Sequence, residues 1–348
     1  MQKHAIILVL FVLISSCLFS QIGGSYTYAF LNLPNSARIA GMGGNVNAIK
    51  DNDISLALVN PSLITSKMNN QIALSFVDYF SDINYGFASY AHDFKKVGTF
   101  DASLQFINYG KFTTADETGV TYGEFTAGEY CFNIGWGRQL DSSFSIGANL
   151  KNIYSHYDEY TSYGIAVDVG GTFSRKNFAA TLLALNIGRQ IKYFTDGNDE
   201  PLPFEIQAGI SQKLARTPFR YSVVLRNLQK FDLTYTDPNN PEPTVDALTG
   251  EPLPEKKFGK FMDKCMRHVV VGGELTPSKN FSIRLGYNYQ RRKELKVDSK
   301  TGTVGFCWGF GFRVKQFHFN YARAAYHLVG SPNHITISTN LSDIFKGK

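Results

Sequence analysis

After residue 20, this sequence has no apolar run long enough to cross a bilayer as a helix. Charged residues make up only 18% of the chain, and its net charge of +6 is not gathered into a Lys/Arg block. That distribution gives no sign of a nucleic-acid surface. There are 4 cysteines, and none forms a Cys-x-x-Cys pair, so the spacing of zinc and thioredoxin sites is missing.

Motifs that carry chemistry are equally scarce. There is no Gly-x-Ser-x-Gly nucleophile elbow, although a catalytic triad is recognised by geometry and a barrel hydrolase stays open at this point. Gly41–Gly44 lacks the Lys-Ser/Thr of a phosphate loop, and Asp51–Asp53 lacks the glycine and distal glutamate of an EF-hand. We interpret Asp51–Asp53 as a capped turn, with a calcium loop as the alternative. We expect no enzyme, no catalytic residue, no cofactor and no metal site.

Residues 1–20 have the pattern of a secretory leader. A short basic start at Lys3 is followed by the apolar stretch Ala5–Ile14 and by small residues up to Ser20. We place cleavage near Ser20. Ile14–Cys17 also resembles a lipoprotein cleavage box, which would make Cys17 the first mature residue instead.

From about residue 71 the chain has a two-residue rhythm. In Phe100–Phe106, for example, Phe100, Ala102 and Leu104 alternate with polar residues. Successive strand side chains point to opposite faces, so such a segment is apolar on one side and polar on the other. Aromatic residues make up 14% of the chain. Together these features predict an all-β, transmembrane antiparallel barrel in a bacterial outer membrane. A soluble all-β protein is the alternative.

The spacing of the strand candidates predicts about fourteen strands after an N-terminal plug or periplasmic segment at 21–70. The candidates lie near 71–80, 84–92, 96–109, 124–138, 144–156, 160–174, 178–188, 203–214, 219–231, 266–275, 281–291, 302–314, 317–327 and 334–341. Short links alternate with longer ones at 110–123, 189–202, 232–265 and 292–301. Outer-membrane barrels show this asymmetry, with short periplasmic turns and longer outer loops. We therefore expect a barrel over 71–348 with both of its termini in the periplasm.

The same alternation predicts which side chains face lipid. In one strand candidate the apolar face is formed by Tyr130, Phe132, Ile134 and Trp136. In another it is formed by Val304, Phe306, Trp308, Phe310 and Phe312. The opposite parity carries the charged residues Asp101, Glu129, Lys151, Asp168, Arg284 and Arg313. A charge facing lipid would cost roughly 2–4 kcal/mol at the midplane, so these residues should face the lumen.

The longest link, Asp232 to Lys264, is the candidate partner-binding region. It begins acidic and proline-rich and ends with Lys256, Lys257 and Lys260 interleaved with Phe258 and Phe261. Long loops on a rigid scaffold commonly carry binding. A solvated outer loop without a partner is the alternative.

The N-terminal segment also carries a resemblance to a known family. Tyr28–Gly44, followed by Asp51–Ile54 and Asn60–Leu63, resembles the opening of PorQ-like proteins, which are outer-membrane components of the type IX secretion system related to PorV- and FadL-type barrels. The resemblance implies a fourteen-stranded barrel in the complex that attaches cargo to the cell surface.

The resemblance also implies partners: a PorZ-like surface protein, with PorU- and PorV-like components and lipopolysaccharide nearby. The alternative is a FadL-like transporter of fatty acids or other hydrophobic compounds. A transporter would need an apolar pocket near the N-terminal segment and a kink or opening in the wall, for which Gly170–Gly171 and Gly272–Gly273 are candidates.

Overall fold

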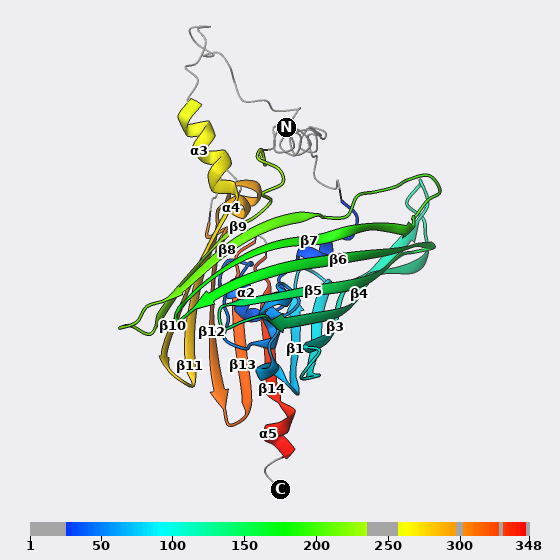
Figure 1. Cartoon of the computed structure of the whole chain (residues 1–348). Helices are drawn as coiled ribbons and strands as arrows, with labels where there is room; N and C mark the ends of the chain where they lie inside the picture. Colours follow the sequence, from blue (N-terminus) through cyan, green and yellow to red (C-terminus); the bar gives the residue numbers. More distant parts are fainter. Residues whose placement is uncertain (1–25, 235–256, 297–301, 327–329, 346–348) are drawn as a thin grey trace, which may run out of the picture.

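Fourteen antiparallel strands form one closed barrel in the computed structural model, which describes residues 26–234, 257–296, 302–326 and 330–345 (Figure 1). Each strand pairs with its sequence neighbours, and β1 closes the ring against β14. The strands are β1 (Gln71–Asp78), β2 (Asn84–Asp93), β3 (Thr99–Ala115), β4 (Thr121–Gln139), β5 (Phe144–Tyr157), β6 (Tyr160–Arg175), β7 (Phe178–Lys192), β8 (Glu205–Lys213), β9 (Phe219–Leu225), β10 (Val269–Ser278), β11 (Phe281–Asn288), β12 (Phe306–Val314), β13 (Phe317–Ala324) and β14 (Asn333–Asn340). The predicted antiparallel barrel is confirmed.

The helices are short and lie inside or beyond the barrel. They are the 3-10 turns η1 (Ala29–Asn32), η2 (Ile54–Leu56), η3 (Pro61–Leu63) and η4 (Ser66–Met68), and the α-helices α2 (Ala37–Gly41), α3 (Lys257–Arg267), α4 (Tyr289–Leu295) and α5 (Leu341–Phe345). No helix in the described ranges combines the length and the apolar character that a membrane span needs.

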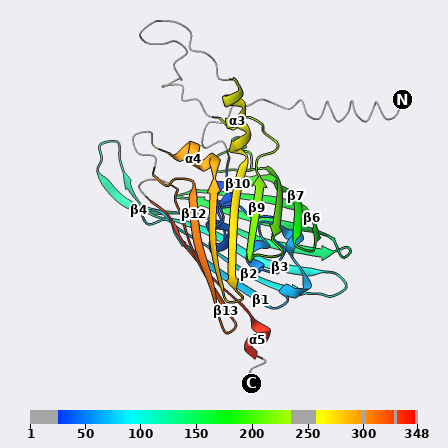
Figure 2. The ribbon, with the colours of Figure 1, turned by 90° about the vertical axis from the view of Figure 1, so that its left-hand side faces the viewer.

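The two ends of the barrel differ in their connections. One end, here the short-turn end, carries tight turns such as Lys176–Asn177 and Lys315–Gln316, and α5 follows β14 there. The opposite, long-loop end carries α3 and α4 (Figure 2). One expected loop is wrong. Residues 110–123 are mostly strand, because β3 and β4 stay paired out to Ala115 and Thr121. They form a hairpin that prolongs the wall.

The two faces of the wall follow the predicted parity. Phe132, Ile134 and Trp308 are exposed on the outside, whereas Asp101, Glu129, Lys151, Asp168 and Arg284 are buried inside. Arg313, near the end of its strand, is exposed instead. Val304 contradicts its predicted face, since it is buried and precedes β12, where the alternation does not yet apply.

The core of the molecule lies in the lumen. Residues 27–68, here called the plug, run through the barrel and are mostly buried. The plug starts at the long-loop end, where the Thr27 amide donates to the carbonyl of Pro201. It leaves at the short-turn end, where Asn69 Oδ1 accepts from the amide of Asp93. The barrel is therefore filled by its own chain.

Candidate functional site

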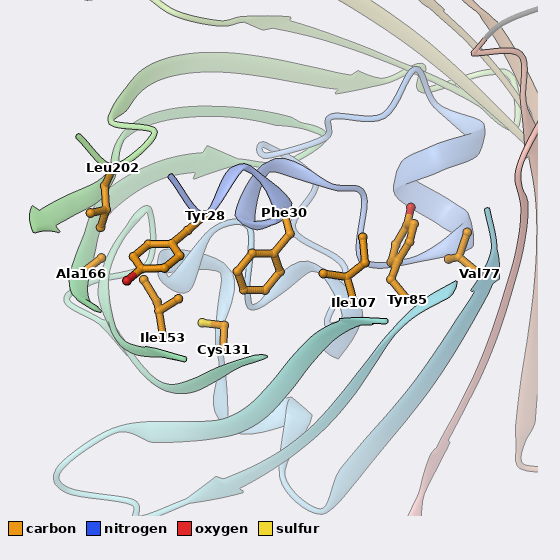
Figure 3. Packing of buried hydrophobic residues seen from close by; sticks show 9 residues of the cluster. All are labelled: Tyr28, Phe30, Val77, Tyr85, Ile107, Cys131, Ile153, Ala166 and Leu202. Atoms are coloured by element: carbon orange, nitrogen blue, oxygen red, sulfur yellow. The ribbon is translucent and has the colours of Figure 1, made fainter. Parts of the chain in front are cut away.

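At the long-loop end, the plug fills the lumen with apolar side chains. Tyr28 and Phe30 point toward inner-face residues of the wall, among them Tyr85, Ile107 and Ile153 (Figure 3). All of these side chains are buried. Cys131, a buried free cysteine of β4, belongs to the same cluster. At the long-loop end, the lumen is therefore a packed hydrophobic core.

Farther along, glycines on the inner face let the plug backbone touch the wall. A Cβ on Gly286 would lie 2.0 Å from the amide nitrogen of Gly43, and one on Gly147 would lie 2.3 Å from the carbonyl carbon of Pro61. No real side chain fits at such distances. The small residues of the inner parity thus make room for the plug, as a filled lumen requires.

Asn60 fastens this middle part through hydrogen bonds. Its Nδ2 donates to the carbonyl of Asn47 at 2.6 Å and to Thr172 Oγ1 at 3.2 Å, and its Oδ1 accepts from Ser62 Oγ at 2.6 Å. Asn60 also caps η3 by accepting from the Ser62 amide. The Asn-Pro-Ser motif therefore shapes the plug and ties it to the wall.

Near the short-turn end, the plug is held by a group of six charged residues, here called the Arg38 cluster: Arg38, Asp51, Asp53, Arg220, Glu274 and Arg284. Arg38, on α2, contacts Asp51 (2.6 Å), Asp53 (2.9 Å) and Glu274 of β10 (2.8 Å). Its side chain is almost fully buried. Three guanidinium groups face three carboxylates, so the charges inside the cluster balance.

The rest of the Arg38 cluster joins the plug to three neighbouring strands. Arg220 of β9 contacts Asp51 at 2.7 Å and Glu274 at 3.1 Å, and Arg284 of β11 contacts Glu274 at 2.8 Å. Sequence reasoning missed this cluster, because Arg38 and Glu274 are 236 residues apart.

Asp51–Asp53 form a capped turn as expected. Asp53 Oδ1 accepts from the Ser55 amide at 3.0 Å and caps η2, while its Oδ2 accepts from Arg38. Both aspartates therefore serve the Arg38 cluster. No group of His, Cys, Asp and Glu within the described ranges could hold a metal ion.

A polar cavity of about 720 Å³ lies between the Arg38 cluster and the short-turn end. Beyond the cluster, its lining includes Lys213, Lys279, Arg313, Asn320 and Ser338. Charged and amide side chains of this kind retain water. The cavity therefore has the wrong chemistry for a hydrophobic ligand.

A second, much smaller cavity of about 40 Å³ lies between the plug and the inner face of β5, β7 and β8. Leu31, Leu33, Leu58 and Leu185 contribute apolar surface to it, and Lys151, Asn186, Gln207 and Arg226 are among its polar lining residues. Pockets for drug-sized ligands have roughly 300–1,000 Å³, so this cavity holds no such ligand in the structure as it stands.

The wall beside the small cavity is interrupted by a bulge. The β6–β7 pairing shifts register between Val167 and Val169, close to Gly170–Gly171. The extra residue, Asn186, is held there because its amide donates to Asp168 and its Oδ1 accepts from Lys151 at 2.8 Å. Gly170–Gly171 themselves pair regularly on both sides, and so do Gly272–Gly273. Neither predicted glycine pair forms a bulge, and the bulge that exists lies beside Gly170, at Asp168 and Asn186.

The candidate partner-binding region, Asp232 to Lys264, lies partly outside the described residues, which leave out 235–256. Its final part is not a loop, because Lys257–Arg267 form α3. Phe258, Phe261, Met262 and Cys265 recur at helical spacing, and this signal was present in the sequence.

Helix α3 is tied to α4 through Asp263. This carboxylate accepts from Tyr289 at 2.7 Å and contacts Lys293 at 2.9 Å and Arg267 at 2.8 Å. Burial would raise the pKa of Asp263, but the hydrogen bonds from Lys293, Tyr289 and Arg267 lower this pKa to about 2. The pKa of Lys293 is raised by its hydrogen bond to Asp263.

No protein-family model matches the sequence, and no curated protein matches it. The chain is similar in structure to the Pseudomonas putida toluene transporter TodX, with a TM-score of 0.52 and 12% identity over 89% of this chain and 99% of that one. A deltaS2 mutant of the TodX monoaromatic hydrocarbon channel has a TM-score of 0.50 and 12% identity, over 88% of this chain and 97% of that one. A Pseudomonas aeruginosa FadL homologue has a TM-score of 0.49 and 10% identity, over 88% of this chain and 98% of that one. The chain has the fold of FadL-like outer-membrane barrels.

Proposed function

We propose that this chain is a non-enzymatic outer-membrane barrel that anchors a secreted partner at the cell surface, as a component of the type IX secretion attachment complex. The observation that carries this proposal is the contrast between the filled lumen and the exposed rim at the long-loop end. The lumen is packed with the plug, whereas the long-loop end displays α3, α4 and the β3–β4 hairpin. Such a molecule offers more surface for docking than space for transport.

The packing of the plug supports this choice. Tyr28 and Phe30 occupy the lumen at the long-loop end. The Arg38 cluster, with its six paired charges, occupies the lumen near the short-turn end. Opening a path through the lumen would expose both the buried aromatic side chains and the Arg38 cluster to water. The resemblance of Tyr28–Leu63 to PorQ-like proteins implies which partner is anchored, namely a PorZ-like surface protein close to PorU- and PorV-like components and lipopolysaccharide.

In this proposal the long-loop end faces outside and the short-turn end faces the periplasm. Both ends of the strand series lie at the short-turn end, because β1 begins and β14 ends beside each other there. Short periplasmic turns are the rule in barrels of this kind.

The test is deletion of the chain in its own bacterium, followed by immunoblotting of the PorZ-like protein in cells and medium. Anchoring predicts that the partner is released into the medium and that a plasmid copy restores it to the cells. Unchanged retention of the partner in the deletion strain would contradict the proposal.

A second candidate function is passage of a hydrophobic compound across the outer membrane. The bulge at Asp168 and Asn186 favours it, since Asn186 also lines the small cavity to which four leucines contribute. The fold shared with a toluene transporter also supports it more directly than it supports anchoring. The small cavity would have to grow several-fold, by movement of Leu31–Pro34, to admit such a compound.

The two functions separate in the same deletion strain. Transport predicts poorer uptake of a labelled long-chain fatty acid or of toluene, with the partner still on the cells. Anchoring predicts unchanged uptake and a released partner.

A further inference from the structure

The polar cavity at the short-turn end, here called the vestibule, is enclosed by the barrel wall and the plug together. Its floor is the Arg38 cluster, in which Arg38, Glu274 and Arg284 are buried. Its rim includes Lys213 at the end of β8 and Lys279 in the β10–β11 turn, and both of these side chains are exposed. The vestibule is therefore closed on the side of the plug and open on the side of the turns. Its volume of about 720 Å³ falls within the roughly 300–1,000 Å³ of ligand pockets.

Basic side chains line one arc of the vestibule wall. Each strand from β8 to β13 except β10 places one on its inner face near the short turns: Lys213, Arg220, Arg284, Arg313 and His318. The neighbours of opposite parity, such as Phe312 and Val314, are exposed on the outside. Because successive strand side chains point to opposite faces, these basic groups point into the lumen and not toward lipid.

The charges of the vestibule do not balance. The six charges of the Arg38 cluster cancel, three against three. Among the other lining residues, Lys213, Lys279 and Arg313 are positive and Asp343 is negative, which makes three charges against one, a net +2. Within the described ranges, the side chains of Lys213 and Lys279 form no ion pair or hydrogen bond, and that of Arg313 donates only to the carbonyl of Lys315. The rim thus carries cations that the protein itself does not neutralise.

Hydrogen-bond donors in the floor are also left open. Arg220 uses only Nη1 in its contacts with Asp51 and Glu274. Arg284 uses Nε toward Glu274 and Nη1 toward Asn320. Among the residues that the structure describes, neither arginine has a hydrogen-bond partner for Nη2, although both line the vestibule. Guanidinium groups with a free edge are suited to carboxylate and phosphate oxygens.

The rest of the lining consists largely of amide and hydroxyl side chains, among them Ser278, Asn280, Gln316, Asn320 and Ser338. Such groups both donate to and accept from hydroxyl groups of a ligand. A bare inorganic anion would leave most of them unused. The combination of free cations with many neutral polar groups therefore fits an anion that also carries hydroxyl groups.

We propose that the vestibule binds a hydroxylated anion, namely a sugar that carries phosphate or carboxylate groups. Lys213, Lys279 and Arg313 attract and hold its charged group, because a cleft lined by one sign of charge concentrates ions of the other sign. The amide and hydroxyl side chains hold its hydroxyl groups. This inference does not depend on anchoring, since the vestibule lies at the opposite end of the barrel from α3 and α4 (Figures 1 and 2).

The test is isothermal titration calorimetry of the full-length chain in a neutral detergent, with glucose 6-phosphate, glucose and inorganic phosphate as the probes. Glucose 6-phosphate should bind, inorganic phosphate should bind more weakly, and glucose should not bind. The variant Lys213→Gln/Lys279→Gln/Arg313→Gln should weaken binding of glucose 6-phosphate by about tenfold or more, since it removes the three unneutralised charges. Heat-modifiable migration on gels should be unchanged, because all three side chains are exposed.

The matched control is Lys95→Gln/Lys96→Gln/Lys176→Gln. It removes the same three positive charges from exposed turn residues at the same end, and none of the three lines the vestibule. This control should keep its affinity for glucose 6-phosphate. Equal weakening in both triple variants would overturn the vestibule as the site, because the net charge of that end would then explain binding.

The remaining outcomes would overturn the sugar assignment. Absence of glucose 6-phosphate binding would do so, and so would equal affinity for inorganic phosphate. Tighter binding of a hexaglutamate peptide would identify an acidic protein segment as the occupant. Binding of phosphatidylglycerol vesicles without glucose 6-phosphate binding would identify a lipid headgroup. None of these results bears on anchoring, which is tested by release of the surface partner.

Discussion

The inner face of the barrel wall and the rim at its long-loop end follow opposite rules. Inside, charged and amide side chains are buried and paired, as Arg38 is with Asp51, Asp53 and Glu274. At the rim, aromatic side chains such as Phe258 are exposed, while polar ones such as Asp263 are used to hold the helices. The lumen is therefore built to keep its contents, whereas the rim leaves apolar side chains exposed.

The largest effect is expected from Arg38→Met. This change leaves Asp51 and Glu274 with fewer cations in a buried site, and removing one member of such a pair costs about 3–5 kcal/mol. Unfolding in urea, followed in detergent by the loss of heat-modifiable migration on gels, should reveal that loss. Lys111→Met is the matched control, since Lys111 and Glu124 form an exposed pair, which contributes little. Similar losses in both variants would contradict a special role for the inner charges.

Phe30→Ala tests the apolar end of the same lumen. Phe30 is buried against the wall, and truncating a buried Phe to Ala costs about 3 kcal/mol or more through lost burial and the cavity left behind. The same urea titration measures this loss. Fatty acid uptake gained in Phe30→Ala would show that only this packing keeps the barrel closed, and would favour the channel hypothesis.

Ile134→Arg examines the outer face. Ile134 is exposed on β4 between buried residues, and an arginine facing lipid costs roughly 2–4 kcal/mol at mid-depth. Assembly into vesicles should fall accordingly. Val120→Arg, at an exposed site near the tip of the β3–β4 hairpin, should assemble normally. Equal assembly of both variants would mean that water, not lipid, surrounds β4.

The smallest effect is expected at the rim, from protonation of Asp263. Its pKa lies at about 2 in the folded chain and at 3.8 ordinarily, so the tether is complete above about pH 4 and weakens as the pH falls toward 2. The protection of the α3 amides against hydrogen exchange, taken relative to the intrinsic exchange rate at each pH, should fall over this range. Asp263→Asn should show faster exchange at neutral pH and lose the pH dependence. A pH dependence that persists in Asp263→Asn would contradict this assignment.

Much of the wall could be predicted from local pattern. The alternation of Phe132 and Ile134 with Asn133 correctly gave the two faces, because strand side chains have a period of two. The same rule failed at Val304, since the strand begins only at Phe306. Local patterns thus predict faces well and the ends of strands less well.

The contacts that hold the plug could not be predicted. Arg38 reaches Glu274 only because the closed ring holds α2 inside the barrel against β11–β14, with Glu274 of β10 in reach, and no spacing in the sequence encodes that approach. The Asp51–Asp53 pair was visible in the sequence, but nothing there identified Arg38 as its partner. The apolar positions on α3 were also visible at helical spacing, yet they lay inside what composition marked as a loop.

Labelling of intact cells with a membrane-impermeant maleimide tests most directly whether the barrel spans the outer membrane with its long-loop end outside. Single substitutions Phe258→Cys on α3 and Lys279→Cys in a short turn would be compared in a Cys265→Ser background, since Cys131 and Cys307 are buried. A membrane-spanning barrel with its long-loop end outside should be labelled at position 258 in whole cells, and at position 279 only after the outer membrane is broken. Labelling of 279 but not of 258 in whole cells would contradict it.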